Sequence, residues 1–312
     1  MSVHSETASA LFENAFKTFA GRAAFTCLGT TLTYKDVDER SGALAAFFIH
    51  KLKLHAGDRI ALQMPNISQY PIAIYAAMRA GLIIVNVNPL YTPRELQHQL
   101  NDSGAKALIV LANVASDVAK IIDQTAVKHV VVTEIADFMP PIKRQLINFV
   151  VKHVKKMVPN FSFHNSTSYL EAMRQGAKLL VKHGPVEANT QPDHLMALQY
   201  TGGTTGFPKG VMLPHRAIWY NNLVIAKMLS GEPESRYLHA APMFHLADGA
   251  AGGGMSAMGA CHVYVPMFDV DAVMTAIETH QVTHGLLVPT MIGMLLNSPN
   301  FDPKRLSSLQ YL

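Results

Sequence analysis

The chain has 312 residues, of which 49% are hydrophobic and 15% charged, and its formal net charge is +4 at pH 7. This is enough material for a sizeable core or for two packed lobes. The two cysteines, Cys27 and Cys261, lie far apart in sequence. They therefore exclude a disulfide framework and a Cys-type metal site, and they suit a reducing cytosol.

The sequence contains no segment typical of export or of a membrane span. Residues 1–10 are polar and do not resemble a secretory signal. The most apolar window, residues 72–87, is interrupted by Arg79 and falls short of the ~18 uncharged residues that a span needs. We expect a cytoplasmic protein, at most peripheral to the inner face of the membrane, with no nucleic-acid partner.

Strand and helix patterns alternate through the first half of the chain. Strands are predicted over 31–34, 59–64, 83–87, 107–111 and 127–132. Helices are predicted over 11–19, 35–52, 71–80, 94–101 and 114–125. This alternation predicts an α/β lobe in which helices cover both faces of a largely parallel sheet.

Residues 142–158 form a basic amphipathic pattern. Apolar side chains recur at helical spacing, and the charged side chains between them are all lysine or arginine. A helix of this type can lie on an anionic membrane surface, or it can pack one face on its own domain. The sequence alone leaves both interpretations open. The mixed polar residues 159–191, with a helix over 168–181, are the predicted seam between two lobes.

A loop rich in glycine and threonine follows the apolar strand at 195–198. The run from Tyr200 to Gly210 reads Y-T-G-G-T-T-G-F-P-K-G. Glycines let backbone N–H groups approach a polyanion, hydroxyl groups donate to phosphate oxygens, and Lys209 supplies a positive charge. The spacing differs from that of a P-loop NTPase, because Phe207 stands where the second glycine belongs and Gly210 follows the lysine.

The run Tyr200 to Gly210, continued by Val211 to Arg216, resembles the phosphate loop of the adenylate-forming enzymes: acyl-CoA synthetases, luciferases and peptide-synthetase adenylation domains. Segments of the first lobe narrow the resemblance to bacterial long-chain fatty-acid–CoA ligases. They include Met64-Pro65-Asn66, the run from Val85 to Leu96, and Asn101 to Lys106. The resemblance assigns the β- and γ-phosphates of ATP to Thr201, Gly202, Gly203, Thr204, Thr205, Gly206 and Lys209.

The second half carries a further matching motif. A helix over 214–229 and a strand over 237–241 precede Pro242-Met243-Phe244-His245, which resembles the family's Pro-Leu-Phe-His segment. The resemblance implies a catalytic role for His245 where the acyl carboxylate meets the α-phosphate. Relatives that activate amino acids carry an aspartate at about this place, whereas Asp248 comes three residues later. Activation of a simple carboxylic acid is therefore favoured.

The run from Gly249 to Ala260 consists almost entirely of glycine, alanine and methionine. Small residues either let helices pack closely or leave a channel, and methionine gives an adaptable apolar lining. We expect Gly249, Gly253 and Met255 to border an acyl-chain tunnel, with tight helix packing as the alternative. A helix over 269–280, a strand at 282–288, a helix over 291–296 and a strand over 306–312 complete the predicted elements.

The resemblance implies an AMP-binding domain over 11–312, with a first α/β lobe at 11–185 and a phosphate-loop and acyl-binding lobe at 186–312. The family pattern continues beyond Leu312, so we expect the N-terminal portion of a longer ligase without the small C-terminal domain. The implied reaction activates a fatty acid with ATP and Mg²⁺ and transfers it to coenzyme A. No metal ligands are identified within the chain.

Three other interpretations remain open at this point. The acid could be medium-chain or aryl, the chain could be a non-catalytic nucleotide- or lipid-binding form, or it could be an unrelated phosphate-binding scaffold. The long run Tyr200 to Arg216 argues against the last of these. The sequence also leaves a homodimer open.

Overall fold

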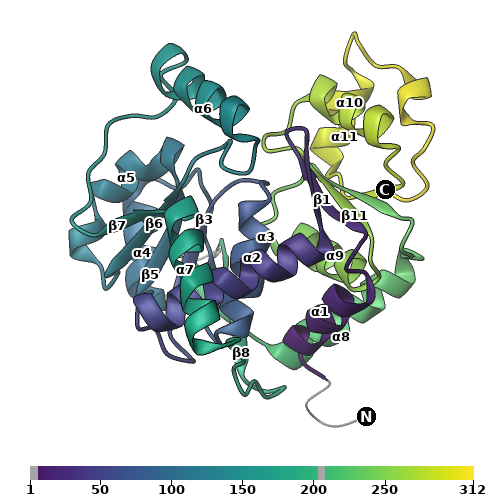
Figure 1. The fold of residues 1–312 in the computed structure, drawn as a ribbon. Coiled ribbons are helices and arrows are strands. Elements are labelled where there is room, and N and C mark those ends of the chain that lie inside the picture. Colours follow the sequence, from purple (N-terminus) through teal and green to yellow (C-terminus); the bar gives the residue numbers. More distant parts are fainter. Residues whose placement is uncertain (1–5, 203–207) are drawn as a thin grey trace. The chain divides into compact units, whose positions relative to one another are not determined.

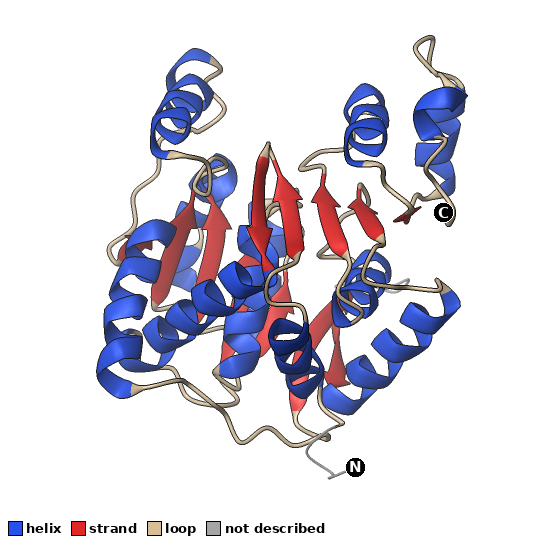
Figure 2. Cartoon of the chain, turned by 45° about the vertical axis from the view of Figure 1, so that its right-hand side comes forward, coloured by secondary structure: helices blue, strands red, loops and turns tan. Residues whose placement is uncertain are grey.

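The computed structural model describes residues 6–202 and 208–312, and the contacts between residues group the chain into two units. Unit 1 comprises residues 1–9, 38–64 and 69–216, and unit 2 comprises residues 10–37, 65–68 and 217–312. The predicted lobes at 11–185 and 186–312 remain a prediction about domains. In each unit, strands lie among helices (Figure 2).

Unit 1 contains a seven-stranded sheet in the order β7-β6-β5-β3-β4-β8-β9. Its strands are β3 (Arg59–Gln63), β4 (Ile83–Asn86), β5 (Ala107–Leu111), β6 (His129–Thr133), β7 (Ser166–Ser168), β8 (Leu195–Thr201) and β9 (Lys209–Pro214). All neighbours pair in parallel except β8 and β9, which pair antiparallel. The helices are α3 (Gln69–Arg79), α4 (Pro93–Ser103), α5 (Ala115–Ala119), α6 (Pro141–Phe149) and α7 (Tyr169–His183), with shorter turns η2 (Phe47–Lys51), η3 (Ala112–Val114), η4 (Ile122–Gln124) and η5 (Val150–Val154).

The inner strand β5 is buried on both faces, because all five of its residues are buried. Leu108 and Val110 join one apolar cluster with Leu96 of α4 and Val118 of α5. Alternate strand residues point to opposite faces, so the remaining β5 side chains lie on the other side of the sheet. Helix α3 packs along β3 and β4, and α7 packs along β6 and β7. The predicted parallel sheet covered by helices is confirmed (Figure 1).

Unit 2 contains a five-stranded sheet in the order β12-β10-β11-β1-β2. Its strands are β1 (Ala23–Cys27), β2 (Thr30–Thr33), β10 (Arg236–His239), β11 (Cys261–Tyr264) and β12 (His284–Gly285), of which only β2 pairs antiparallel. Its helices are α9 (Leu246–Ala257), α10 (Val270–His280), α11 (Pro289–Leu296) and η6 (Pro303–Leu306). Three helices cross the boundary between units: α1 (Ala8–Thr18), α2 (Tyr34–Ala46) and α8 (His215–Met228).

The structure corrects some of the predicted elements and contains strands that were not predicted. The helix predicted over 114–125 is broken into η3, α5 and η4, and no side chain caps α5 at its start. The strand predicted over 306–312 is reduced to one bridge between His284 and Tyr311. Strands β1, β7, β9 and β11 were not predicted. Each is short, and β9 begins inside the run that we interpreted as a loop.

None of the helices in residues 6–202 and 208–312 combines the length and the apolar character needed to cross a bilayer.

Candidate functional site

The phosphate-loop residues flank a hairpin at the edge of the unit 1 sheet. Strand β8 ends at Thr201, β9 begins at Lys209, and these two residues are paired in the antiparallel ladder. The structure therefore brings together Thr201, Gly202 and Lys209 of the predicted set. The other predicted phosphate residues, Gly203, Thr204, Thr205 and Gly206, lie outside the described residues. Ligands of open α/β sheets gather at the carboxyl ends of the parallel strands, which is where β8 ends.

Side chains of the neighbouring strands hold the end of β8. Asn86, at the end of β4, donates through Nδ2 to Gln199 Oε1 at 3.0 Å. The Tyr70 hydroxyl donates to Asn86 Oδ1 at 2.7 Å. One residue beyond Gln199, the Tyr200 hydroxyl donates to Asp102 Oδ2 of α4. Burial raises the pKa of Tyr200, and the Asp102 carboxylate raises it further, so the phenol stays protonated as a donor.

A recess of about 440 Å³ lies beside the hairpin. It is lined by His98, Asp102, Pro208, Lys209 and Gly210. A Cβ on Gly210 would stand 3.0 Å from the Tyr200 ring, so glycine lets the ring lie directly against the β9 backbone. Lys209 thus belongs both to the ladder that fixes its backbone and to the wall of a polar recess that could hold an anion.

His245 lies in unit 2, where it is the N-cap residue of α9. Its Nδ1 accepts from the Ala247 N–H at 3.5 Å, and the residue is exposed. With Nδ1 as an acceptor, the neutral ring carries its proton on Nε2. The side chain can therefore present an N–H donor to a carboxylate or phosphate oxygen.

Asn66 fixes the segment that leads to His245, a role that the sequence did not suggest. Its side chain is buried and makes three hydrogen bonds within unit 2. Nδ2 donates to the carbonyls of His239 and Ala241 at 3.1 and 2.8 Å, and Oδ1 accepts from Met243 N at 2.8 Å. The only available signal was the Met64-Pro65-Asn66 match to the family, which assigned no role to Asn66.

A chain of buried polar side chains underlies α9. Asp248 accepts from His239, whose other ring nitrogen lies 2.8 Å from His262 Nδ1. His262 Nε2 lies 2.9 Å from Ser256 Oγ, and the Tyr237 hydroxyl donates to Asp248 Oδ1 at 3.2 Å. Burial, with His239 nearby, lowers the pKa of His262 well below its usual value. Asp248 is fully buried and both of its carboxylate oxygens accept hydrogen bonds. It is therefore not presented to a substrate amine.

The residues predicted to border an acyl tunnel all lie in α9. A Cβ on Gly253 would stand 2.8 Å from the Asn222 amide, and one on Gly249 would stand 3.0 Å from the Met243 carbonyl. Met255 is fully buried with Tyr237 and other core residues. Close packing within unit 2 thus accounts for these small residues, and the acyl-binding role of Gly249, Gly253 and Met255 remains a prediction.

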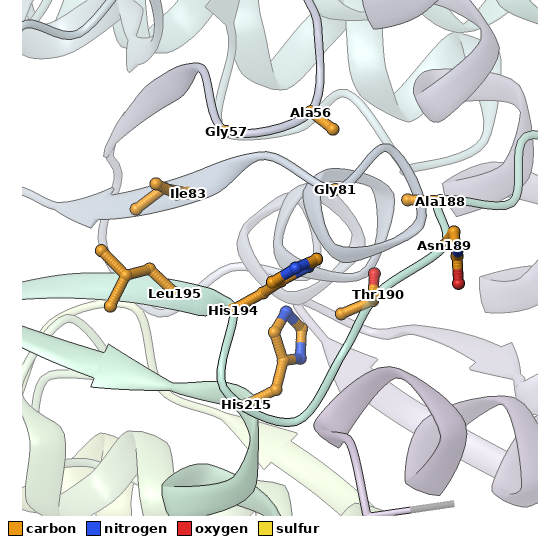
Figure 3. A pocket seen from close by; sticks show the side chains of 10 residues that line it. All are labelled: Ala56, Gly57, Gly81, Ile83, Ala188, Asn189, Thr190, His194, Leu195 and His215. Carbon is orange, nitrogen blue, oxygen red and sulfur yellow. The ribbon is translucent and has the colours of Figure 1, made fainter. Parts of the chain in front are cut away.

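A second recess of about 440 Å³ lies in unit 1, where strands β3, β4 and β8 begin (Figure 3). This is the opposite end of β8 from the hairpin. His215 points toward His194 there, and its buried Nδ1 has no hydrogen-bond partner among the described residues. Burial, with His194 nearby, lowers the pKa of His215 to about 4. The ring is therefore neutral at pH 7.

The described residues contain no group of three or more His, Cys, Asp or Glu side chains that could hold a metal ion. The expectation that the chain itself provides no metal ligands remains a prediction.

A Gly- and Thr-rich segment at the carboxyl edge of a largely parallel sheet is an arrangement of nucleotide-binding α/β proteins. The family model described as AMP-binding enzyme matches residues 12–312. The chain belongs to the AMP-binding enzyme family.

The curated relatives described here are all named as acid–CoA ligases. A long-chain-fatty-acid–CoA ligase of Escherichia coli O157:H7 is 45% identical over 211 residues, which cover 68% of this chain and 37% of that protein. One of Bacillus subtilis is 30% identical over 309 residues, covering 98% of this chain and 54% of that protein. A 4-coumarate–CoA ligase 2 of Nicotiana tabacum is 28% identical and covers 89% of this chain. The chain spans about half or less of the length of these relatives.

Solved structures share the fold. A long-chain-fatty-acid–CoA ligase from Archaeoglobus fulgidus has a TM-score of 0.76 at 24% identity, covering 93% of this chain and 53% of that one. An anthranilate CoA ligase in complex with anthranoyl-AMP has a TM-score of 0.79 at 20% identity, covering 97% and 54%. These likenesses support the α/β architecture of an adenylation domain.

Proposed function

We propose that the chain carries out the adenylating part of an ATP-dependent acid–CoA ligase reaction. A carboxylate oxygen attacks the α-phosphorus of ATP, the bond to pyrophosphate breaks, and an acyl adenylate forms. The thiol of coenzyme A then attacks the acyl carbon and AMP leaves. The observation that carries this proposal is the hairpin that places Thr201 and Lys209 opposite each other at the carboxyl edge of the sheet. Membership of the AMP-binding enzyme family supports it.

The residues have separate roles in this proposal. Lys209, Thr201 and Gly202, together with Gly203, Thr204, Thr205 and Gly206, bind the β- and γ-phosphates and offset the charge that develops on pyrophosphate. His245 donates from Nε2 to an oxygen at the acyl–phosphate junction and orients the attacking carboxylate. Mg²⁺ neutralises charge on the bound triphosphate. None of these roles requires the chain itself to provide a metal site.

Long-chain fatty acid is the proposed substrate class, because the relatives from Escherichia coli O157:H7 and Bacillus subtilis are named long-chain-fatty-acid–CoA ligases. Medium-chain and aryl acids are the alternatives. The relative named 4-coumarate–CoA ligase 2 is the reason to retain the aryl class. The enclosure of Asp248 disfavours amino acids, since no carboxylate at that position reaches a substrate amine. The proposed small-molecule partners are therefore a fatty acid, ATP and coenzyme A.

Acid-dependent ATP–pyrophosphate exchange tests the substrate class. Palmitate, octanoate and 4-coumarate are compared on the 312-residue chain and on a fusion completed with the C-terminal part of the Bacillus subtilis relative. Strongest exchange with palmitate supports the fatty-acid proposal, and strongest exchange with 4-coumarate replaces it with an aryl-acid ligase. MgATP binding without exchange in either protein would favour the non-catalytic nucleotide-binding alternative.

We include in this proposal a peripheral membrane contact through residues 142–158. Three apolar side chains of α6 are exposed: Ile142 is 84% exposed, Leu146 60% and Phe149 58%. They recur at spacings of four and three residues and so share one face. Neither α6 nor η5 contains a buried residue, and α6 stands clear of the sheet of its own unit (Figure 1). Ile147, Val150 and Val151 are partly buried, so packing on the chain's own domain remains the alternative.

A polar residue attaches α6 to unit 1 instead. Asn148 donates to Glu134 Oε2 at 2.8 Å and accepts from Ala136 N at 3.2 Å, on a different face from Ile142 and Leu146. The helix is thus held on the side of Asn148, while Ile142 and Leu146 on another face are exposed.

The positive charge of residues 142–158 favours contact with an anionic membrane surface. Lys143, Lys152, Lys155 and Lys156 are exposed, and no acidic residue occurs between Asp137 and Glu171. Exposed apolar side chains flanked by lysines are the pattern of helices that lie in the interface of an anionic bilayer. A surface of this kind would bring the enzyme to substrates that partition into membranes.

Vesicle co-sedimentation tests the membrane contact. The triple variant Lys152→Gln, Lys155→Gln, Lys156→Gln should bind vesicles containing phosphatidylglycerol at least about tenfold more weakly, since each lysine contributes roughly 1 kcal/mol. The matched control replaces three exposed lysines elsewhere in unit 1: Lys128→Gln, Lys178→Gln and Lys182→Gln. Equal binding of both triple variants, or binding indifferent to anionic lipid, would remove this part of the proposal.

A further inference from the structure

Helix α4 contacts the hairpin on both sides of its turn. His98 Nε2 lies 3.2 Å from the Pro208 carbonyl, immediately before β9, and Asp102 accepts from the Tyr200 hydroxyl near the end of β8. His98 and Asp102 are four residues apart, which places them one turn apart on the same face of the helix. One helical face therefore reaches both strands of the hairpin close to Lys209.

The helix that makes these contacts is itself firmly placed. A capping box between Thr92 and Glu95 closes its first turn, and Gly104 ends it in the left-handed conformation with φ 61°. These caps satisfy backbone groups that would otherwise let the ends fray. Along its length, Gln99 Nε2 donates to the Asn86 carbonyl at 2.8 Å, and Arg59 Nε donates to the Ser103 carbonyl at 2.8 Å.

The contacts also shape the recess beside the hairpin. His98 and Asp102 form one wall, and Pro208, Lys209 and Gly210 form the other. A shift of α4 or of either strand would therefore change where Lys209 stands relative to the recess.

We propose that His98 and Asp102 are positioning residues for the phosphate hairpin: by holding Pro208 and Tyr200, they fix Lys209 before the nucleotide arrives. This inference rests on the proposed function, in which Lys209 binds the phosphates of ATP. A lysine whose backbone is already placed loses less conformational freedom on binding, so preorganisation raises the affinity for the triphosphate.

The test compares four variants of the 312-residue chain. His98→Ala removes the contact to Pro208, and His98→Gln keeps an N–H donor in its place. Asp102→Ala removes the acceptor of the Tyr200 hydroxyl. Gln97→Ala is the matched control, because Gln97 lies on the same helix but donates to Gln124 at 2.9 Å instead of to the hairpin.

Two quantities are measured on each variant. MgATP and inorganic pyrophosphate affinities are obtained by calorimetric titration, and backbone hydrogen exchange is followed in peptides covering 195–202 and 208–214. We expect His98→Ala and Asp102→Ala to weaken MgATP binding about fivefold, the loss expected for one hydrogen bond, and to speed hydrogen exchange in the hairpin. His98→Gln should recover most of the affinity, and Gln97→Ala should match the wild type.

Unchanged affinity and unchanged hairpin exchange in His98→Ala and Asp102→Ala would overturn the inference. A loss of thermal stability with no change in MgATP affinity would also overturn it, because the contacts would then be structural only. If the wild-type chain binds neither MgATP nor pyrophosphate, the proposed function fails. In that case, faster hydrogen exchange in the hairpin of the variants would still support the claim that α4 restrains the hairpin.

Discussion

His239 Nδ1 lies 2.5 Å from Asp248 Oδ2, and both side chains are at most 1% exposed. The pair joins the end of β10 to the first turn of α9 and thereby fixes both ends of the segment that carries His245. An acidic side chain close to the predicted catalytic histidine thus has a structural partner, which explains why its presence does not indicate an amino-acid substrate.

Replacing Asp248 should destabilise unit 2. Asp248→Ala leaves His239 and the Tyr237 hydroxyl without their acceptor in the core, and breaking a buried pair of this kind costs about 3–5 kcal/mol. The free energy of unfolding from urea titration measures the loss, with Asp123→Asn at an exposed site as the control. A loss below about 1 kcal/mol would show that the network contributes little to stability.

Asn66→Asp should also destabilise unit 2, because it removes hydrogen-bond donors from the core. The substitution keeps the acceptor for Met243 N but removes the donors to the carbonyls of His239 and Ala241. We expect a loss of about 3 kcal/mol, because two buried carbonyls lose their donor and a carboxylate is placed beside them. Asn221→Asp on exposed α8 surface is the matched control. Equal unfolding free energies for the two variants would contradict this role for Asn66.

His215 should make unit 1 less stable in mild acid. Its pKa is about 4 in the folded chain and about 6.5 when unfolded, so the unfolded chain binds the proton first as the pH falls. Stability is therefore fully present above about pH 6.5 and is lost as the pH falls toward 4, by up to about 3 kcal/mol.

The variant His215→Gln isolates this contribution. Other buried histidines such as His262 act with the same sign, so the comparison is between wild type and variant at each pH. Urea unfolding at pH 7.5 and pH 4.5 should show a smaller pH effect in the variant. The same pH effect in both proteins would mean that His215 is protonated alike in the folded and unfolded chains.

Lys209→Ala should abolish most MgATP binding without destabilising the fold. The side chain is exposed and borders the recess, so its removal leaves no buried group unsatisfied. Loss of one charge-assisted contact to phosphate should weaken binding roughly tenfold or more. Calorimetric titration with MgATP measures this loss, and Lys128→Gln serves as the control. Unchanged affinity would contradict the assignment of Lys209.

The local part of the fold could be predicted from the sequence. The continuous apolar run of β5 and the helix between Pro93 and Gly104 carry signals within a few residues, and both were confirmed. Strand β9 gave no such signal, because its six residues are exposed or only partly buried and their pairing with β8 depends on the register across the turn.

The organisation of the site depends on pairs that are distant in sequence. Tyr200 and Asp102 are 98 residues apart, and Asn66 and Met243 are 177 apart. Both pairs join motifs that the sequence did show, but spacing within one motif carries no information about which other motif it contacts. The residues that bind ligand were therefore easier to propose than the residues that hold them in place.

The central claim is that the hairpin at Thr201 and Lys209 binds the phosphates of ATP while an acid is adenylated. ATP–pyrophosphate exchange with palmitate, measured on the fusion protein with and without Lys209→Ala, tests it most directly. The account predicts exchange that depends on palmitate and falls by at least about tenfold in the variant. Exchange of equal rate in the two proteins would contradict it.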